Sequence, residues 1–215
     1  MARLLLKRLT TSERNLLRDD RAVAMLEFAF SLPLLLTLGL GGMELANLAL
    51  AHLRVSQIAM TTADNAGRVR VAVDEADINE VFIGASTVGE SLDFEENGRI
   101  VLSSLQDNGR TGSAHGQMIN WQRCFGDLDV DPEYGVEGDG RTDGDLQAMG
   151  QEGRQIQSLP GTAVMFVEVS YEYQPIVGDA ILGATMIRYE SAFNVRERDM
   201  FDITNTTSLP VNSCT

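Results

Sequence analysis

The sequence is poor in the side chains that build metal centres and catalytic sites. Its 215 residues include only two cysteines and two histidines, and the spacing of Cys124, Cys214, His52 and His115 matches no zinc-ligand pattern. It contains no GxSxG nucleophile turn, no Walker A loop, no HExxH helix and no dinucleotide-binding fingerprint. These absences predict a protein that is not an enzyme and that holds neither a metal ion nor a cofactor.

Positive charge is also scarce, and its distribution is uneven. Lys and Arg number 17 against 31 Asp and Glu, which gives a formal net charge of −14. Residues 1–21 carry six cations and three acids, a balance of +3, so the rest of the chain carries −17, or −15 without Glu27 and Glu44. A field of that sign repels phosphate backbones, which argues against nucleic acid as a partner.

The longest apolar run covers residues 22–43 and contains a single ionisable side chain, Glu27. A helix of that length extends roughly 33 Å, enough to cross a hydrocarbon core of about 30 Å. The cations precede the run, so the positive-inside rule predicts a single span with residues 1–21 in the cytoplasm and the acidic bulk of the chain outside. A buried core helix and a signal peptide cut near Gly39–Gly41 are the two alternatives, and the length and one-sided charge favour neither.

Glu27 distinguishes this run from an ordinary anchor. A carboxylate near the centre of a membrane helix costs about 2.5–3.5 kcal/mol on insertion scales, so its presence needs a reason. One interpretation is that Glu27 snorkels or is protonated near the interface. The other is that it meets a positive charge within an assembly of similar helices, and a free N-terminal ammonium exposed by cleavage would be such a partner.

The N-terminal motif resembles that of a known family. The stretch RDDRAVAMLEFAFSLPLLL (residues 18–36), followed by Gly42-Met-Glu44, is similar to TadE/TadG-like pseudopilins, minor components of the tight-adherence, Flp-type pilus machine. The resemblance implies a leader (residues 1–22) that a prepilin peptidase removes, with Ala22 as its last residue and Val23 as the first of the mature chain. Glu27 and Phe28 then hold the family's fifth and sixth positions. Ala22 stands where the family usually has Gly.

The resemblance also implies a function. A minor pilin of this kind would assemble through its N-terminal helix into the pilus or its biogenesis machine and support surface adhesion, with Glu27, Phe28 and Glu44 serving assembly and charge pairing. Its partners would be membrane lipids, the prepilin peptidase and other pilin subunits. It would reside in the bacterial inner membrane with a periplasmic C-terminal domain, or in the pilus at the cell surface. The alternative is a membrane-anchored periplasmic binding module or adhesin that is neither processed nor assembled.

The helix is expected to continue beyond the membrane segment, which we place at residues 23–44. Apolar and small residues recur at steps of three and four over residues 45–73, which predicts an amphipathic continuation and one helix over about 22–73. Packing of this face against the protein's own domain is the main expectation, and packing against another subunit is the alternative. The residues of the predicted stripe are Leu45, Leu48, His52, Val55, Ala59, Thr62, Ala66, Val69 and Val73.

The remaining residues, 74–215, predict an acidic α+β domain. Segment 162–173 alternates apolar and polar residues in its second half, segment 186–196 alternates as well, and 99–104 reads as a shorter strand. The two longer strands predict an antiparallel pair with 99–104 as a third strand, in a small sheet that buries one face against the long helix. The overall expectation is a pilin-like α+β fold.

The two cysteines lie beyond the span, where an oxidising compartment would join them. A Cys124–Cys214 disulfide would close a loop of about 90 residues and stabilise the domain by roughly 4–5 kcal/mol in the chain-entropy model. A catalytic thiol at Cys124, with His115 as its base, is an alternative that no surrounding motif supports.

The segment between Gly126 and Gly153 is rich in glycine and in acidic residues, which predicts a surface loop or mobile linker. Its carboxylates at 127–131 and 139–145 could attract Ca²⁺, but neither run completes an EF-hand loop. A solvated acidic loop is the expectation.

Overall fold

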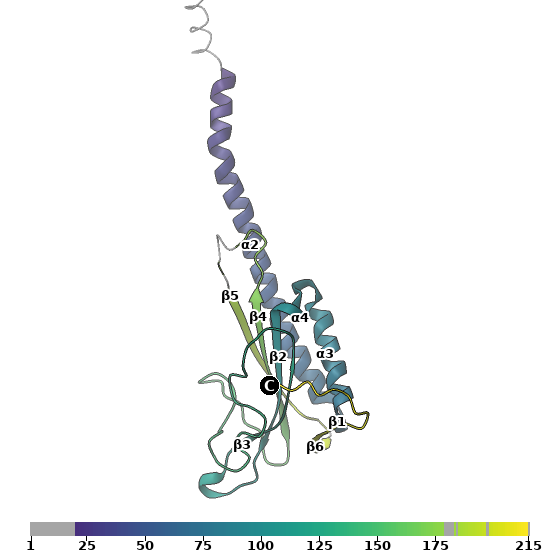
Figure 1. Cartoon of the computed structure of the whole chain (residues 1–215). Helices are drawn as coiled ribbons and strands as arrows, with labels where there is room; N and C mark the ends of the chain where they lie inside the picture. Colours follow the sequence, from purple (N-terminus) through teal and green to yellow (C-terminus); the bar gives the residue numbers. More distant parts are fainter. Residues whose placement is uncertain (1–19, 179–182, 184, 197, 215) are drawn as a thin grey trace, which may run out of the picture. The chain divides into compact units, whose positions relative to one another are not determined.

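The computed structural model describes residues 20–178, 183, 185–196 and 198–214. The chain divides into two compact units, Met1–Ala46 and Asn47–Thr215, and each is described by itself. Most of the predicted leader lies outside the described residues. The fold class is as predicted: a long apolar N-terminal helix is followed by a small, mainly antiparallel sheet domain (Figure 1).

The long helix α2 runs over Asp20–Arg68 and continues through Pro33. Proline removes one backbone donor and its ring crowds the preceding turn, so a proline in a helix interior is ordinarily destabilising. Membrane helices tolerate it because Ser and Thr side chains help to satisfy the carbonyl groups around it. The expected first half of the helix is therefore present as a single element.

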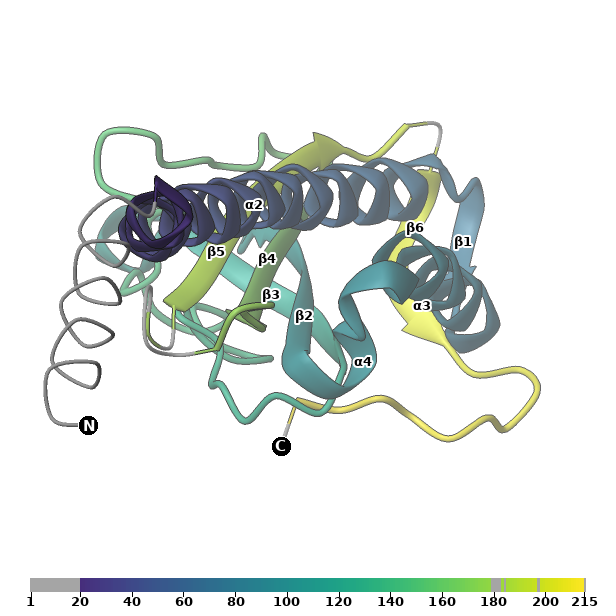
Figure 2. The ribbon, with the colours of Figure 1, turned by 90° about the horizontal axis from the view of Figure 1, so that it is seen from above.

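Within the second unit, α2 buries one face of its residues 47–68. The buried side chains recur at steps of three and four and pack with strand residues in the main hydrophobic core. This confirms the predicted packing of the helix against the protein's own sheet (Figure 2). The predicted stripe began too early, because Leu45 is 61% exposed, and it missed several core positions. The fully buried helix residues are Ala51, Val55, Ile58, Ala59, Thr62, Ala63 and Ala66.

The helix ends at Arg68, five residues before the predicted end at Val73. Its last carbonyl groups are taken by residues from the far end of the chain. Arg198 donates from Nη2 to the carbonyl of Ala66 (2.8 Å) and from Nε to that of Val69 (3.1 Å). The backbone N–H of Arg196 donates to the carbonyl of Gly67 (3.1 Å). These contacts replace the next helical turn, which sequence periodicity alone could not reveal.

A short strand and a second helix follow at once. Strand β1 covers Val71–Asp74 and pairs in parallel with β6, Arg198–Thr204. Asp74 then caps helix α3, Glu75–Gly89, through a reciprocal capping box with Asp77. Backbone hydrogen bonds from Thr206 and Ala76 lower the pKa of Asp74 to about 2. Helix α3 and the β1–β6 pair were not predicted.

The main sheet has four strands in the order β3-β2-β4-β5, and all three neighbouring pairs are antiparallel. The predicted pair corresponds to β4, Ala163–Tyr173, and β5, Thr185–Asn194, while the predicted third strand is part of β2, Gly98–Asp107. The edge strand β3, Gln117–Phe125, was missed. Short turns of 3₁₀ helix (Glu90–Leu92 and Gly112–Ala114) and the one-turn helix α4, Phe94–Asn97, complete the connections.

The second face of this sheet is covered by the segment between Gly126 and Gly153, which was predicted as a surface loop or mobile linker. Met149 and the partly buried Tyr134 and Leu146 from this segment pack on Phe166 and other sheet residues in a second hydrophobic cluster. Backbone hydrogen bonds bind the segment to β3, including two between Ile119 and residues 138 and 139. The segment has no helix or long strand, but it is a packed layer of the domain. The segment agrees with the predicted surface loop, and its packing contacts argue against the mobile-linker alternative.

One glycine shows how closely this layer approaches the sheet. Gly140 has a φ of +71°, and a Cβ atom there would lie 2.0 Å from the carbonyl oxygen of Gln117. Only glycine fits both the left-handed backbone and this approach. At this position glycine permits tight packing of the segment against β3.

Candidate functional site

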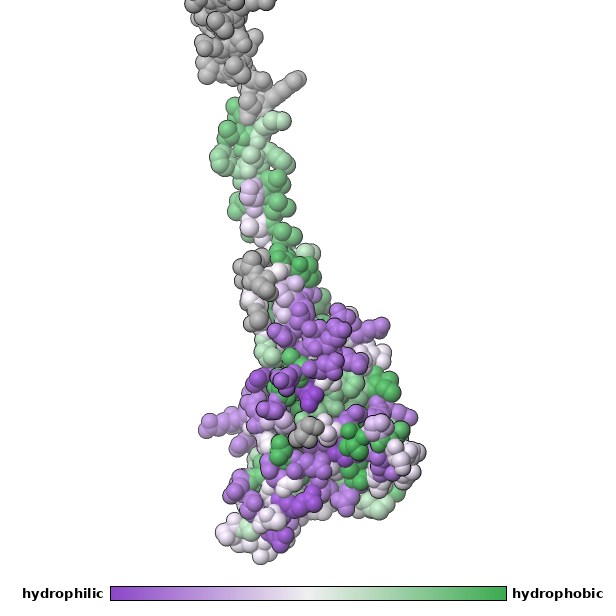
Figure 3. All heavy atoms as spheres, viewed as in Figure 1, coloured by the Kyte–Doolittle hydropathy of each residue, from purple (hydrophilic) through white to green (hydrophobic). Residues whose placement is uncertain are grey.

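The first half of α2 exposes its apolar side chains all round. Its most apolar window of 18 residues contains no buried residue, and the helix is long and apolar enough to cross a membrane. Figure 3 shows the hydrophobic surface of this segment in green, whereas the surface of the second unit is mixed and largely hydrophilic in the same view. This apolar N-terminal helix suggests a membrane anchor. Its exposed large side chains are Val23, Met25, Leu26, Phe28, Phe30, Leu32, Leu34, Leu35, Leu36, Leu38, Leu40 and Met43.

The hydroxyl groups on this apolar segment are satisfied by the helix itself. Ser31 donates from Oγ to the carbonyl of Phe28 (3.2 Å), and Thr37 donates from Oγ1 to that of Pro33 (2.7 Å). In hydrocarbon no water is available to such groups, so internal hydrogen bonds are required. These contacts make the segment compatible with a lipid environment despite its two hydroxyl side chains.

The predicted processing and assembly residues lie together at the start of this helix. Ala22 is a helical residue of α2, and Val23 is 58% exposed. Glu27 is exposed, and Phe28 next to it is 61% exposed. Residues 23 and 27 are one helical turn apart and therefore lie on the same helix face. The geometry places a carboxylate next to the position that would become the chain's first residue after cleavage.

Glu44, the third predicted assembly residue, lies in a different environment. It is fully buried, although its neighbours Met43 and Leu45 are 46% and 61% exposed. A buried carboxylate needs a compensating partner, because an uncompensated buried charge is costly. Glu44 therefore does not present its charge on the surface of the helix as Glu27 does.

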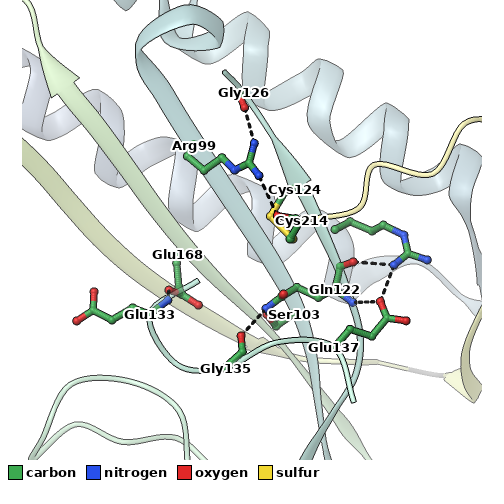
Figure 4. Close-up of a disulfide and its surroundings, with 11 residues drawn as sticks. Arg99, Ser103, Gln122, Cys124, Gly126, Glu133, Gly135, Glu137, Glu168 and Cys214 are labelled. Atoms are coloured by element: carbon green, nitrogen blue, oxygen red, sulfur yellow. Dashed lines mark hydrogen bonds and ion pairs between the residues drawn. A yellow bond between two sulfur atoms is a disulfide. The ribbon is translucent and has the colours of Figure 1, made fainter. Parts of the chain in front are cut away.

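The predicted disulfide is present and joins Cys124 in β3 to Cys214, with their Cα atoms 4.9 Å apart. The surrounding contacts hold the C-terminal tail along β3: the N–H of Cys124 donates to the carbonyl of Asn212 (2.8 Å). Arg99 reaches the same region, donating to the carbonyls of Gly126 (2.8 Å) and Cys214 (3.4 Å) (Figure 4). Cys124 is therefore a structural cysteine, and the catalytic-thiol interpretation is wrong.

A buried ion pair that the sequence analysis missed lies nearby. Arg123 binds Glu75, with Nη2 and Oε1 2.6 Å apart, and its Nη1 lies 2.9 Å from Oε2 of Glu137. Burial alone would lower the pKa of Arg123, but the hydrogen bond and charge of Glu75, with those of Glu137, raise it above its ordinary value. The pair joins α3, β3 and the packed acidic layer. No local pattern signals it, because Glu75 and Arg123 are 48 residues apart.

Two carboxylates of the second acidic run considered for Ca²⁺ accept hydrogen bonds from nearby backbone groups. Asp139 accepts from the N–H of Val136 (2.8 Å) and Asp143 from that of Asp145 (3.2 Å). Over the described ranges, no group of three or more His, Cys, Asp or Glu side chains is placed to hold a metal ion.

A comparison with known families agrees with the N-terminal motif. Residues 22–64 match the family model described as TadE-like protein. No curated protein and no solved structure matches the chain. The matched region begins at Ala22 and covers the apolar half of α2 and most of its amphipathic half. The predicted resemblance is thereby confirmed for this region, and it supports a protein associated with the Tad pilus.

Proposed function

We propose that this TadE-like protein is a minor pilin or pseudopilin that assembles through α2 into a tight-adherence pilus or its biogenesis machine. The observation that carries the proposal is an apolar helix segment exposed on every side, with a lone carboxylate at the fifth position after the predicted cleavage site. The family match begins at the residue preceding that site. A helix with these features suits a bundle of similar helices as well as a lipid bilayer.

The proposed processing step removes residues 1–22 and leaves Val23 with a free ammonium group. Because Glu27 lies one turn further on the same face, its carboxylate can neutralise that ammonium on its own chain or on an adjacent one. An unpaired charge in hydrocarbon costs several kcal/mol, whereas a matched pair is tolerated. Charge pairing would therefore favour the register in which subunits assemble.

The glycines of α2 support close approach of another helix. A Cβ atom placed on Gly39, Gly41 or Gly42 would meet nothing within 4 Å in this chain. Small residues at helix surfaces let two membrane helices pack backbone to backbone. Glu27 and Phe28, which are exposed, form the proposed contact with neighbouring subunits, and Glu44 is proposed to serve charge pairing in the assembly.

The first experiment is an intact-mass measurement of the chain expressed with and without a prepilin peptidase. We expect a peptidase-dependent loss of residues 1–22, and we expect Ala22→Gly to increase the cleaved fraction because glycine is the family's usual residue there. An intact N-terminus in both cultures would instead favour a membrane-anchored periplasmic binding module.

A second experiment separates cleavage from assembly. Glu27→Gln keeps the size of the side chain and removes its charge, so we expect normal cleavage and loss of co-purification with the other pilus subunits. Asp64→Asn, on the same helix outside the apolar segment, is the matched control and should leave co-purification unchanged. Normal co-purification of the Glu27 variant would contradict the charge-pairing role.

A further inference from the structure

A cavity of about 260 Å³ lies on the face of the sheet that the acidic layer covers. Its floor is formed by β2, β4 and β5, and residues 130–134 form the opposite wall. This cavity is remote in sequence from the apolar segment of α2 and takes no part in the proposed assembly. Its lining residues include Val101, Val130, Glu133, Glu168, Val169 and Glu190.

Glu168 is the unusual residue of this cavity. Its side chain is 9% exposed, and its Oε1 atom has no hydrogen-bond partner among the described residues. Its other oxygen accepts from the backbone N–H of Glu133 (2.8 Å), and Figure 4 shows these two residues side by side. A buried carboxylate oxygen without a partner is energetically unfavourable, and native structures seldom retain one without a reason.

Neighbouring negative charges make an ionised Glu168 still less favourable. Glu190 lies directly opposite on β5, and like charges at opposite positions of neighbouring strands are destabilising. Tyr134 donates its hydroxyl proton to Glu190, so that carboxylate has a partner. Arg188 lies 3.3 Å from Glu133 at the exposed rim. The charge of Arg188 lowers the pKa of Glu168, but burial and the charges of Glu133 and Glu190 outweigh this effect.

Arg99, the other cationic residue that lines the cavity, makes its hydrogen bonds to groups other than Glu168. Its two terminal nitrogens donate to the carbonyls of Gly126 and Cys214, away from Glu168. The lining thus has four carboxylates, including that of Asp131, against two guanidinium groups, both of which have other partners. The cavity carries an excess of negative charge at a buried position.

We propose that this cavity binds a primary alkylammonium group, and that the carboxylate of Glu168 supplies the charge that holds it. Val101 and Val130 provide an apolar wall for a methylene chain, and Tyr134 brings an aromatic ring suited to a cation. The last side-chain torsion of Glu is soft, so a small rotation can turn the free oxygen towards the ligand. Although four carboxylates line the cavity, no group of three or more His, Cys, Asp or Glu side chains in the described part of the chain is placed to hold a metal ion, and the apolar wall favours an organic cation.

Protonation of Glu168 predicts that binding of the ammonium group depends on pH. Burial, together with the charges of Glu133 and Glu190, raises the pKa of Glu168 to about 7. An ammonium ligand prefers the ionised carboxylate, so binding releases a proton and weakens when the pH falls below 7. For a pKa near 7 the apparent affinity should rise about tenfold between pH 6 and pH 8. The other facing groups are Asp131, Tyr134, Arg99 and Arg188.

The test is calorimetric titration of the full chain in detergent micelles. The probes are n-butylammonium chloride, which represents a free amine, and Nα-acetyl-lysine methylamide, which represents a lysine side chain of a partner protein. n-Butanol is the uncharged control. We expect saturable binding of at least one amine and none of n-butanol. Binding of butylammonium alone would identify a free amine as the source of the ligand, and binding of the lysine derivative would identify a protein side chain.

The matched variants are Glu168→Gln and Glu172→Gln, which lie on the same strand. Glu168→Gln should weaken amine binding at least tenfold, and Glu172→Gln, whose residue does not line the cavity, should change it less than twofold. No saturable binding of either amine, equal binding of n-butanol, or unchanged binding by Glu168→Gln would overturn the proposal. If Glu168→Gln does not fold, the pH dependence of the unmodified chain decides, because a pH-independent affinity contradicts the role of Glu168.

Discussion

The two halves of helix α2 have the same backbone and very different surroundings. Between Val23 and Met43 the large apolar side chains are exposed all round, whereas between Ala51 and Ala66 a narrow face of small and branched residues is completely buried. Polar groups follow the same division. In the first half Thr37 bonds to its own helix, and in the second unit Asn47 reaches across to the hydroxyl of Tyr173 (2.8 Å). The first half of the helix therefore suits hydrocarbon, and the second half suits a protein core.

The difference shows that apolar composition and a folded core are separate properties. In the second unit stability depends on cross-links and packing between distant parts of the chain. In the apolar segment it depends on the environment and on self-contained hydrogen bonds. The following predictions test this contrast, beginning with the largest expected effect.

Loss of the Cys124–Cys214 disulfide should have the largest effect. The bridge spans 90 residues of sequence, and closing a loop of that length stabilises a fold by about 4–5 kcal/mol in the chain-entropy model. Cys124→Ser combined with Cys214→Ser should lower the free energy of unfolding by about this amount in chemical denaturation. A reducing agent should destabilise the unmodified protein similarly and leave the double variant unaffected. Equal stability of the two proteins would show that the bridge contributes nothing.

Truncation of one core residue of α2 should cause the next largest loss of stability. Ile58 is fully buried, while Ile83 on α3 is 66% exposed, so the same substitution can be compared at both sites. Ile58→Ala should cost about 3 kcal/mol through lost burial and the cavity left behind. Ile83→Ala should change stability by less than about 0.5 kcal/mol. Equal denaturation midpoints for the two variants would mean that this half of α2 does not contribute to the core.

The raised pKa of Glu168 predicts a loss of stability as the pH rises. The folded-state pKa is about 7, above the ordinary value of 4.5, so the folded state binds more protons between these values. Stability is therefore greatest below pH 4.5 as far as this group is concerned, and it falls as the pH rises through 7, by about 3 kcal/mol. Denaturation midpoints measured from pH 4.5 to 8 should show this decline in the unmodified protein and a flat profile in Glu168→Gln. A decline that persists in the variant would assign it to another group.

Substitution of Thr62 should have the smallest effect, and it should increase stability. Its buried hydroxyl has no hydrogen-bond partner among the described residues, whereas that of the adjacent Thr61 donates to the carbonyl of Gln57 (2.7 Å). Replacing an unsatisfied buried hydroxyl by a methyl group of similar shape removes a desolvation penalty. Thr62→Val should stabilise the second unit by about 1 kcal/mol. Thr61→Val is the control and should give no gain in thermal unfolding; a loss of stability in Thr62→Val would contradict this reasoning.

The parts of the fold that were predictable from the sequence have local signals. The apolar run of α2 and the alternation of Val167, Val169 and Tyr171 in β4 are patterns within a single segment. The disulfide followed because the chain has only two cysteines. Helix α3 also had a signal that was missed: Ile78, Val81, Phe82 and Ala85 follow the helical period after the cap at Asp74.

Other features have no local signal. Strand β3 is covered on both faces over much of its length, so the alternation that marks a half-exposed strand is lost. The ion pair of Glu75 with Arg123 depends on two segments that meet only in the fold. The candidate assembly residue Glu27 was identifiable because an acid is conspicuous in an apolar run, whereas Glu168 lies among many acids and only its burial distinguishes it.

The pairing of β1 with β6 also has a consequence for the order of events during synthesis. The end of α2 and strand β1 acquire their final hydrogen-bond partners only when Arg198 and strand β6 have been made, more than a hundred residues later. At 5–20 residues per second, a ribosome needs roughly 6–25 s to pass from Asp74 to Arg198. During that interval the last carbonyl groups of α2 lack their final partners, and the cysteine at position 214 is made later still. Synthesis of the C-terminal tail therefore limits how early the domain can complete its fold. A chain released before this tail is made lacks strand β6 and the cysteine that forms the disulfide.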